Sequence, residues 1–149
     1  MKIAGKGQET EVRLEGIINE FSVMHVADIP SGRTVVLDTG EVTAINSLGV
    51  RNWLVFMDAL SRRASRLVIR RLATPLVLQT AAIRDFLGRA HIESFMAPWF
   101  CPVCERTVEF LHRVGEEIRP HPCPKCGKAM VLDDLPDWYA TLSSGSAGA

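Results

Sequence analysis

The sequence has 149 residues, which is enough for one domain of ordinary size and one small module. Hydrophobic residues make up 47% and charged residues 23%, and this usage excludes a disordered, collagen-like or coiled-coil chain. No uncharged stretch exceeds twelve residues, whereas a membrane-spanning helix needs about 20 apolar residues. We therefore expect no transmembrane segment. Residues 1–10 also lack the apolar core and the cleavage site of a secretory signal, which predicts a cytoplasmic location.

Strands and helices are predicted to alternate along the first hundred residues. Apolar residues alternate over Glu11–Ile18 and form a short run over Thr34–Asp38, and both patterns predict strands. Between them, the composition of Phe21–Ala27 predicts about two turns of helix before a break at Pro30. A longer amphipathic helix is predicted over Ser47–Arg63, because apolar residues recur there at helical spacing: Val50, Trp53, Leu54, Met57 and Leu60.

A third strand, a second helix and a fourth strand follow. Arg66–Arg70 has the pattern of a strand. Thr74 is the expected N-cap of the second helix, Pro75 fits its first turn, and Gly88 is expected to end it. The last strand of this region is predicted over Ile92–Phe95. Alternation of strands and helices predicts an α/β fold, with a mainly parallel or mixed sheet and crossover helices that bury its face.

The four cysteines lie in the last third of the chain, as two Cys-x-x-Cys pairs separated by 18 residues. This spacing is typical of a structural zinc site, in which two loops each supply two thiolates and complete a tetrahedron around the ion. Gly127 supplies the positive φ that such a loop commonly needs, whereas Glu105 fits the corresponding position less well. We therefore predict that Zn²⁺ is bound by four residues: Cys101, Cys104, Cys123 and Cys126.

Two disulfides or a thioredoxin-like redox pair are the competing interpretations of these cysteines. Disulfides need an oxidising compartment, and a redox pair normally occurs singly at the start of a helix. His112 and His121 are available as further ligands, but four thiolates already fill a zinc site, so we expect both histidines on the surface.

A zinc-ribbon-like module is predicted over residues 98–142. Its hairpin is expected from the strand-like segment Glu105–His112 and a turn at Gly115. A module of roughly 40 residues cannot build a sufficient apolar core, so metal coordination would supply much of its folding free energy. The acidic segment Asp133–Tyr139 is expected to pack its aromatic residues on the module, and residues 143–149 are predicted to form a flexible tail.

The segment Val35–Val50 resembles the central signature of the STAS domain, a family found in anti-sigma-factor antagonists, stress-signalling scaffolds and the cytoplasmic ends of anion transporters. Its matching features are an apolar strand that ends in Asp38, a short loop, and an Asn-Ser-Leu-Gly turn that opens a helix. The helix that begins at Thr74 and the strand after it also fall where the family places its next elements. The resemblance implies a STAS-like domain over residues 8–97.

The resemblance also implies a docking surface at the start of the Ser47–Arg63 helix. In phosphorylatable members of the family, a partner kinase modifies the serine that Ser47 matches, although Asn46 here replaces an aspartate and Leu48 a second serine. Ser47 is therefore the candidate phosphorylation site, and the implied docking residues are Asn46, Ser47, Gly49 and Asp38. A simpler interpretation stays open, in which Asn46 caps the helix, Ser47 is an ordinary first-turn residue, and Gly49 allows tight packing.

The formal net charge is zero, but residues 51–89 contain eight arginines and only two acidic residues. Most of these arginines are expected to be solvated. The alternative is an electrostatic docking patch formed by Arg62, Arg63, Arg66, Arg70 and Arg71. Nucleic acid is the less favoured partner, because aromatic residues make up only 7% and no stacking motif accompanies the arginines.

An enzyme is the least supported functional class, because the sequence shows no nucleophile–base arrangement, phosphate-binding glycine loop or open metal site. The leading hypothesis is a non-catalytic cytoplasmic regulatory module that binds a protein such as an anti-sigma factor or serine kinase. A second hypothesis is a nucleic-acid-binding or transcription-linked scaffold that uses the ribbon and the basic patch. A third is a redox sensor that releases zinc on oxidation. The oligomeric state stays open.

Overall fold

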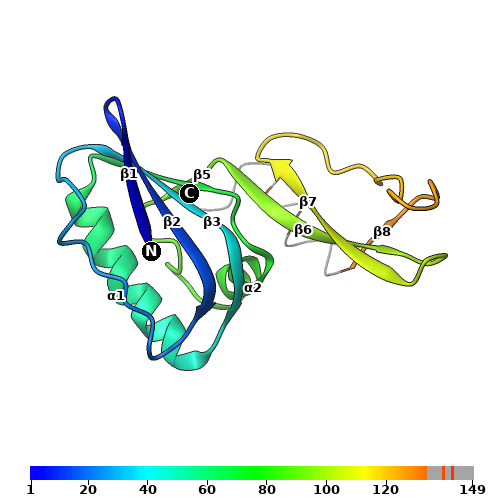
Figure 1. The fold of residues 1–149 in the computed structure, drawn as a ribbon, viewed down its shortest axis with the longest axis horizontal. Helices are drawn as coiled ribbons and strands as arrows, with labels where there is room; N and C mark the ends of the chain where they lie inside the picture. The colour runs from blue at the N-terminus through cyan, green and yellow to red at the C-terminus, as the bar shows by residue number, and fades with distance from the viewer. Residues whose placement is uncertain (134–138, 140–141, 143–149) are drawn as a thin grey trace.

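The structure is a computed structural model that describes residues 1–133, 139 and 142. The first part of the chain forms the elements β1 (Lys2–Lys6), β2 (Glu9–Ile18), β3 (Thr34–Ile45), α1 (Ser47–Arg63), β4 (Arg66–Arg70), α2 (Thr74–Ala82) and β5 (His91–Ile92) (Figure 1). The second part contains β6 (Ser94–Cys101), β7 (Arg106–Arg113) and β8 (Val131–Leu132).

Five strands form a mixed sheet in the order β1-β2-β3-β4-β5. The β1–β2 pair is antiparallel, and the other three pairs are parallel. The second sheet has the order β7-β6-β8 and is antiparallel throughout. It projects from the side of the first sheet (Figure 1). The predicted mixed α/β fold is therefore confirmed for the five-stranded sheet and its two helices.

One face of the five-stranded sheet carries the apolar core. In β2 the buried residues Val12 and Leu14 alternate with exposed ones, as the sequence pattern predicts. Residues of β3, β4 and both helices join the same core cluster: Val35, Leu37, Leu67, Ile69, Trp53, Phe56, Met57, Leu60, Leu76 and Val77. Trp53 is fully buried, and its indole N–H donates to the carbonyl of Phe86 at 2.8 Å. This bond ties α1 to the chain that follows α2.

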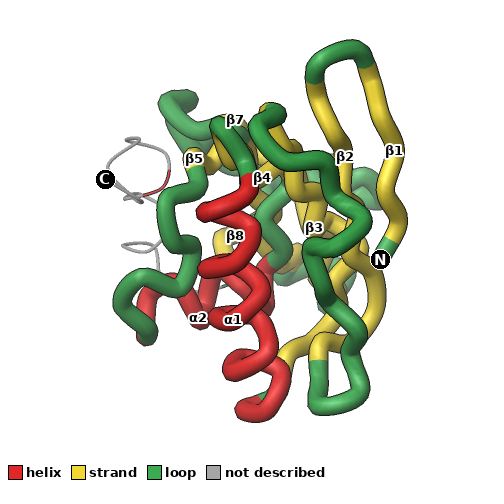
Figure 2. The backbone as a smooth tube through the Cα atoms, turned by 90° about the vertical axis from the view of Figure 1, so that its left-hand side faces the viewer, coloured by secondary structure: helices red, strands yellow, loops and turns green. Residues whose placement is uncertain are grey.

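The connection between β2 and β3 is not a helix, so the prediction for Phe21–Ala27 is wrong. The side chain of Asn19 accepts from the backbone N–H of Phe21 at 2.9 Å and starts a turn. After the turn, Ser22, Met24 and Val26 are half-buried and alternate with exposed residues, which is the period of extended chain. The connection runs alongside α1 (Figure 1 and Figure 2), where Asn52 donates to the carbonyl of Asn19.

Two other elements differ in length from their predictions. β3 does not stop at Asp38 but continues to Ile45, where it pairs with β2 alone. α2 ends at Ala82, well before Gly88, and its N-cap is Ala73 rather than Thr74. No side chain caps this helix, and Thr74 instead lies 3.5 Å from the carbonyl of Met96.

The two sheets are joined through β6. The predicted strand Ile92–Phe95 is divided between β5 and β6, and β6 is continuous across residues 97 and 98, where the sequence places the module boundary. Leu72, just after β4, forms a parallel bridge with Phe95 and exchanges backbone hydrogen bonds with Ser94 and Met96 at 2.9 and 2.8 Å. The second sheet is therefore held against the first by backbone hydrogen bonds and not only by the continuous chain.

The end of the chain is described only in part. Tyr139 is fully buried, and its ring centroid lies 6.0 Å from that of Phe95 in β6, which precedes the predicted module boundary at residue 98. The rest of the acidic segment after Asp133, and the predicted tail over residues 143–149, lie outside the described residues.

Candidate metal centre

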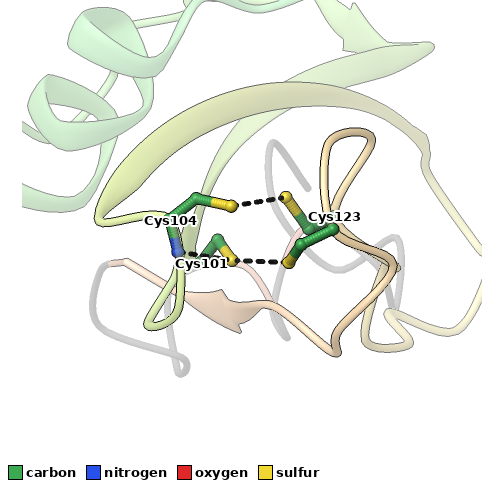
Figure 3. Close-up of side chains that lie close together, drawn as sticks. Cys101, Cys104 and Cys123 are labelled. Carbon is green, nitrogen blue, oxygen red and sulfur yellow. Dashed lines mark hydrogen bonds between the residues drawn. The ribbon is translucent and has the colours of Figure 1, made fainter.

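The four cysteine sulfurs lie within 4.8 Å of one another (Figure 3). The Sγ atoms of Cys101 and Cys126 are 3.5 Å apart, and those of Cys104 and Cys123 are 3.9 Å apart. A tetrahedral thiolate site with metal–sulfur bonds of about 2.3 Å has sulfur–sulfur edges of about 3.8 Å. All four cysteines are free thiols. The cluster therefore has the dimensions to hold a metal ion such as zinc, and it contains no disulfide.

The two cysteine loops have the same backbone hydrogen bond. The N–H of Glu105 donates to the carbonyl of Cys101, and the N–H of Gly127 donates to the carbonyl of Cys123, each at 2.8 Å. Both donors have positive φ, 51° for Glu105 and 74° for Gly127. Glu105 thus adopts a conformation that is unfavourable for a residue with a side chain, because the loop closes in the same way in both pairs.

Each loop is closed by a short stretch of paired backbone. Cys101 is the last residue of β6, and it pairs with Arg106 at the start of β7. In the second loop, the backbone N–H of Cys123 donates to the carbonyl of Lys128 at 2.8 Å. An antiparallel bridge between Pro122 and Ala129 closes this loop. The backbone hydrogen bonds of the two loops therefore position the cysteines, with little contribution from side-chain contacts.

The thiols have very different acidities. Backbone N–H groups of Cys126 and Lys125 lower the pKa of Cys123 to about 6. Hydrogen bonds to the neighbouring thiols, that of Cys126 first, raise the pKa of Cys104 to about 12. Thiolates this close repel one another, so the full set of four is stable only beside a cation. The electrostatics of the cluster, like its geometry, therefore favour a bound metal ion.

His112 and His121 do not lie free on the surface, so that expectation is wrong. Both are half-buried, His112 within β7 and His121 in the segment between β7 and β8. The indole N–H of Trp99 donates to Nε2 of His112 at 3.0 Å, and the ring of His121 stacks on Phe110 with centroids 4.4 Å apart. Burial, and secondarily the nearby His121, lower the pKa of His112. Together with Trp99 and Phe110, the two histidines form a small aromatic cluster.

At the start of α1, the structure brings three of the four predicted docking residues together. Asn46 caps the helix, because its Oδ1 accepts from the N–H of Gly49 at 2.7 Å. Gly49 is buried, and a Cβ atom there would overlap the backbone carbonyl of Ile18. Asn46 and Gly49 thus have structural roles. Ser47 and Leu48 are exposed.

Asp38, the fourth predicted docking residue, is not on that surface. It lies in the middle of β3 and is 3% exposed. Arg71 contacts it at 2.9 Å, and Arg13 lies 3.8 Å from it. The sequence could not reveal this pairing, because the partners lie 25 and 33 residues away along the chain.

The five arginines of the predicted basic patch are separated and mostly engaged. Arg62 pairs with Asp58 at 3.0 Å, and Arg63 donates to backbone carbonyls of the β2–β3 connection. At the other end of β4, Arg70 pairs with Glu93 at 2.8 Å, and Arg71 pairs with Asp38. Arg63 and Arg66 have no ion pair with a described residue, and Arg66 lies at the start of β4. The ion pairs at Arg62, Arg70 and Arg71 lower the net positive charge of the predicted patch.

Exposed apolar side chains near the start of α1 are a feature that the sequence analysis missed. Phe21 is 80% exposed, Ile17 is 59% exposed and Leu48 is 51% exposed. The first two flank the turn at Asn19, which is hydrogen-bonded to α1 through Asn52. A helix over Phe21–Ala27 would have buried part of this group of side chains. Their exposure therefore follows from the extended backbone of the connection.

Comparison with family models, with curated proteins and with solved structures finds no match for this chain.

Among the described residues, no helix combines the length and the apolar character needed to cross a membrane.

Proposed function

We propose that this chain is a non-catalytic regulatory module of the STAS type, which binds a partner protein at the start of α1. The observation that carries this proposal is the exposure of Ser47 and Leu48 on a helix start whose backbone is fixed by Asn46 and Gly49. A rigid, exposed segment of this kind suits recognition, because little conformational entropy is lost on binding.

The apolar surroundings of Ser47 support a protein as the partner. Ile17 is exposed near the end of β2, Phe21 is exposed on the β2–β3 connection, and Leu48 follows Ser47 directly. Grouped apolar side chains on a surface mark sites of protein binding. An anti-sigma factor or a serine kinase is the partner class that the resemblance implies.

Phosphorylation of Ser47 is the proposed switch. The phosphate would lie at the positive end of the α1 dipole, so it would disturb the helix little. Asn46, however, donates from its side chain to the carboxylate of Glu20 at 3.0 Å. A phosphate on Ser47 would therefore add charge beside an existing carboxylate, and its main effect would be to repel an acidic or apolar partner.

Zinc is the proposed metal of the cysteine cluster, within a C-terminal zinc ribbon formed by the β6–β7 hairpin and the second cysteine loop. Four thiolates leave no open coordination position, so the proposed role is structural. Four free thiols also suit a reducing compartment, which supports a cytoplasmic location. A nucleic-acid scaffold is the weaker alternative, since the arginines that it would use are occupied by Asp58, Glu93 and Asp38.

Affinity capture with the full zinc-loaded chain tests the proposed docking surface. We expect a regulatory protein to be retained by wild type and by Ser47→Ala, and lost with Ser47→Asp. Ser31→Asp is the matched control, because Ser31 is an exposed serine beside Gly32, which bonds to the opposite end of α1. Equal retention by Ser47→Asp and wild type would contradict the proposal, as would loss of the partner with Ser31→Asp.

A further inference from the structure

The second half of β3 has an open edge. On one side, β2 pairs with β3 as far as Ile45. On the other side, β4 pairs with β3 only over Thr34–Asp38, and no other described strand continues that pairing. From Gly40 to Ile45, the edge of β3 that faces away from β2 therefore has no strand partner among the described residues.

This edge lines a groove of about 580 Å³. Six consecutive residues of β3, from Gly40 to Ile45, contribute to its wall. Side chains on one face of a strand would contribute only every second residue, so an unbroken run indicates that the groove meets the strand edge-on. The facing walls come from α2, with Pro75, Leu78 and Gln79, and from Glu109 of β7.

An extended peptide is the ligand that matches such a wall. Backbone N–H and C=O groups along an open edge need hydrogen-bond partners, and an added strand supplies them in register. Six residues of strand extend over about 20 Å, which corresponds to a peptide of about six residues. Pro75 and Leu78 offer apolar contact to side chains on one face of that peptide.

The charges of the groove indicate the composition of the peptide. Glu41 and Glu109 both line it, and both are exposed. Glu41 lies 3.3 Å from the guanidinium of Arg71, which also pairs with Asp38. Glu109 forms no ion pair with a described residue. The groove therefore presents uncompensated negative charge, which favours a ligand with lysine or arginine.

We propose that this groove binds an extended segment of a partner protein that carries lysine or arginine, and that the segment adds as a strand to the open edge of β3. The groove shares no lining residue with the exposed Ser47 surface, and its binding does not require phosphorylation. Because β7 provides Glu109 and is held against β6 beside Cys101, the cysteine module forms one wall of the site.

Selection of random nine-residue peptides displayed on phage, against the full zinc-loaded chain, tests this inference. We expect enriched sequences that contain lysine or arginine and little proline, because proline cannot donate to a strand edge. The strongest binder is then synthesised and its affinity is measured by fluorescence anisotropy. Bound peptide should also slow hydrogen exchange at backbone amides within Glu41–Ile45.

Three variants connect the binding to the groove. Gln79→Trp fills the groove from α2 and should weaken binding by at least about tenfold. Glu109→Lys should weaken it by about five- to tenfold, and replacing the basic residue of the peptide by glutamate should restore it. Glu117→Lys is the matched control, because Glu117 is an exposed acidic residue after the β7 turn and does not line the groove.

The inference is overturned if no sequence is enriched, or if enriched peptides bind Gln79→Trp and Glu109→Lys as tightly as wild type. Slower exchange at another strand in place of β3 would also overturn it. Ser47→Asp should bind the peptide normally, so failure here and failure of the proposed docking surface give different results.

Discussion

The guanidinium of Arg71 forms hydrogen bonds with both carboxylate oxygens of Asp38, from Nε and from Nη2, each at 3.0 Å. The pair stands where β4 ends and the open edge of β3 begins. Arg71 has a φ of 53°, a left-handed conformation that costs a non-glycine residue about 1–2 kcal/mol. This bidentate bond to a buried carboxylate offsets that cost and holds the chain in its turn.

Removal of the Arg71 side chain should destabilise the protein, because the buried carboxylate of Asp38 loses its main partner. We expect Arg71→Ala to lower the free energy of unfolding by about 2–3 kcal/mol in urea. Arg71→Gly should cost about 1 kcal/mol less, because glycine adopts the positive φ without strain. Arg62→Ala, which removes an exposed pair with Asp58, is the control and should change stability by less than about 0.5 kcal/mol. Equal effects of Arg71→Ala and Arg62→Ala would contradict this assignment.

Gly49 should tolerate no side chain. A methyl group there overlaps the carbonyl of Ile18, so either α1 or β2 has to shift. We expect Gly49→Ala to lower the free energy of unfolding by about 2 kcal/mol or more. Gly5→Ala is the matched control, because Gly5 has open space around it, and its effect should stay within about 0.5 kcal/mol. Thermal unfolding followed by circular dichroism compares the two, and equal melting temperatures would refute the packing role.

Because Glu105 and Gly127 both have positive φ, substitution by glycine in the first loop and by alanine in the second should have opposite effects on zinc affinity. Glu105→Gly should strengthen zinc binding by about fivefold, because it removes about 1 kcal/mol of backbone strain. Gly127→Ala should weaken binding by a similar factor, since its φ of 74° is unfavourable for alanine while its surroundings are open. Competition with a chromophoric chelator measures both. Glu105→Ala separates loss of charge from relief of strain, and a gain with Glu105→Ala equal to that with Glu105→Gly would rule out the backbone explanation.

His112 should make stability depend on pH. Burial lowers its pKa in the folded protein, so its neutral form contributes stability above the unfolded pKa of about 6.5. That contribution is lost as the pH falls below this value. We expect the unfolding free energy to fall more steeply between pH 7 and pH 5 in wild type than in His112→Gln. His25→Gln, at an exposed histidine, is the matched control. A wild-type slope in His112→Gln would exclude this role.

Local patterns predicted the elements whose burial is one-sided. The alternation over β2 and the helical spacing over α1 place Val12 and Trp53 in the core as expected, because each faces a single large apolar surface. The Cys-x-x-Cys spacing likewise brought the four sulfurs together, since each loop is closed by its own backbone bonds.

Non-local contacts account for the features that could not be predicted. The extension of β3 to Ile45 depends on pairing with β2, not on the composition of Thr39 and Gly40. The burial of Asp38 depends on Arg71, and the continuity of β6 depends on its bridge to Leu72. Each partner is distant in sequence, so no periodicity within a short window can show it.

The most direct test of the cysteine cluster as a structural zinc site is X-ray absorption at the zinc edge, on protein purified without added metal. We expect one zinc per chain with four sulfur ligands at about 2.3 Å. Replacing His112 or His121 by glutamine should leave that spectrum unchanged. Zinc coordinated partly by nitrogen or oxygen, or protein that carries no stoichiometric metal and instead has its four cysteines in disulfides, would contradict the account.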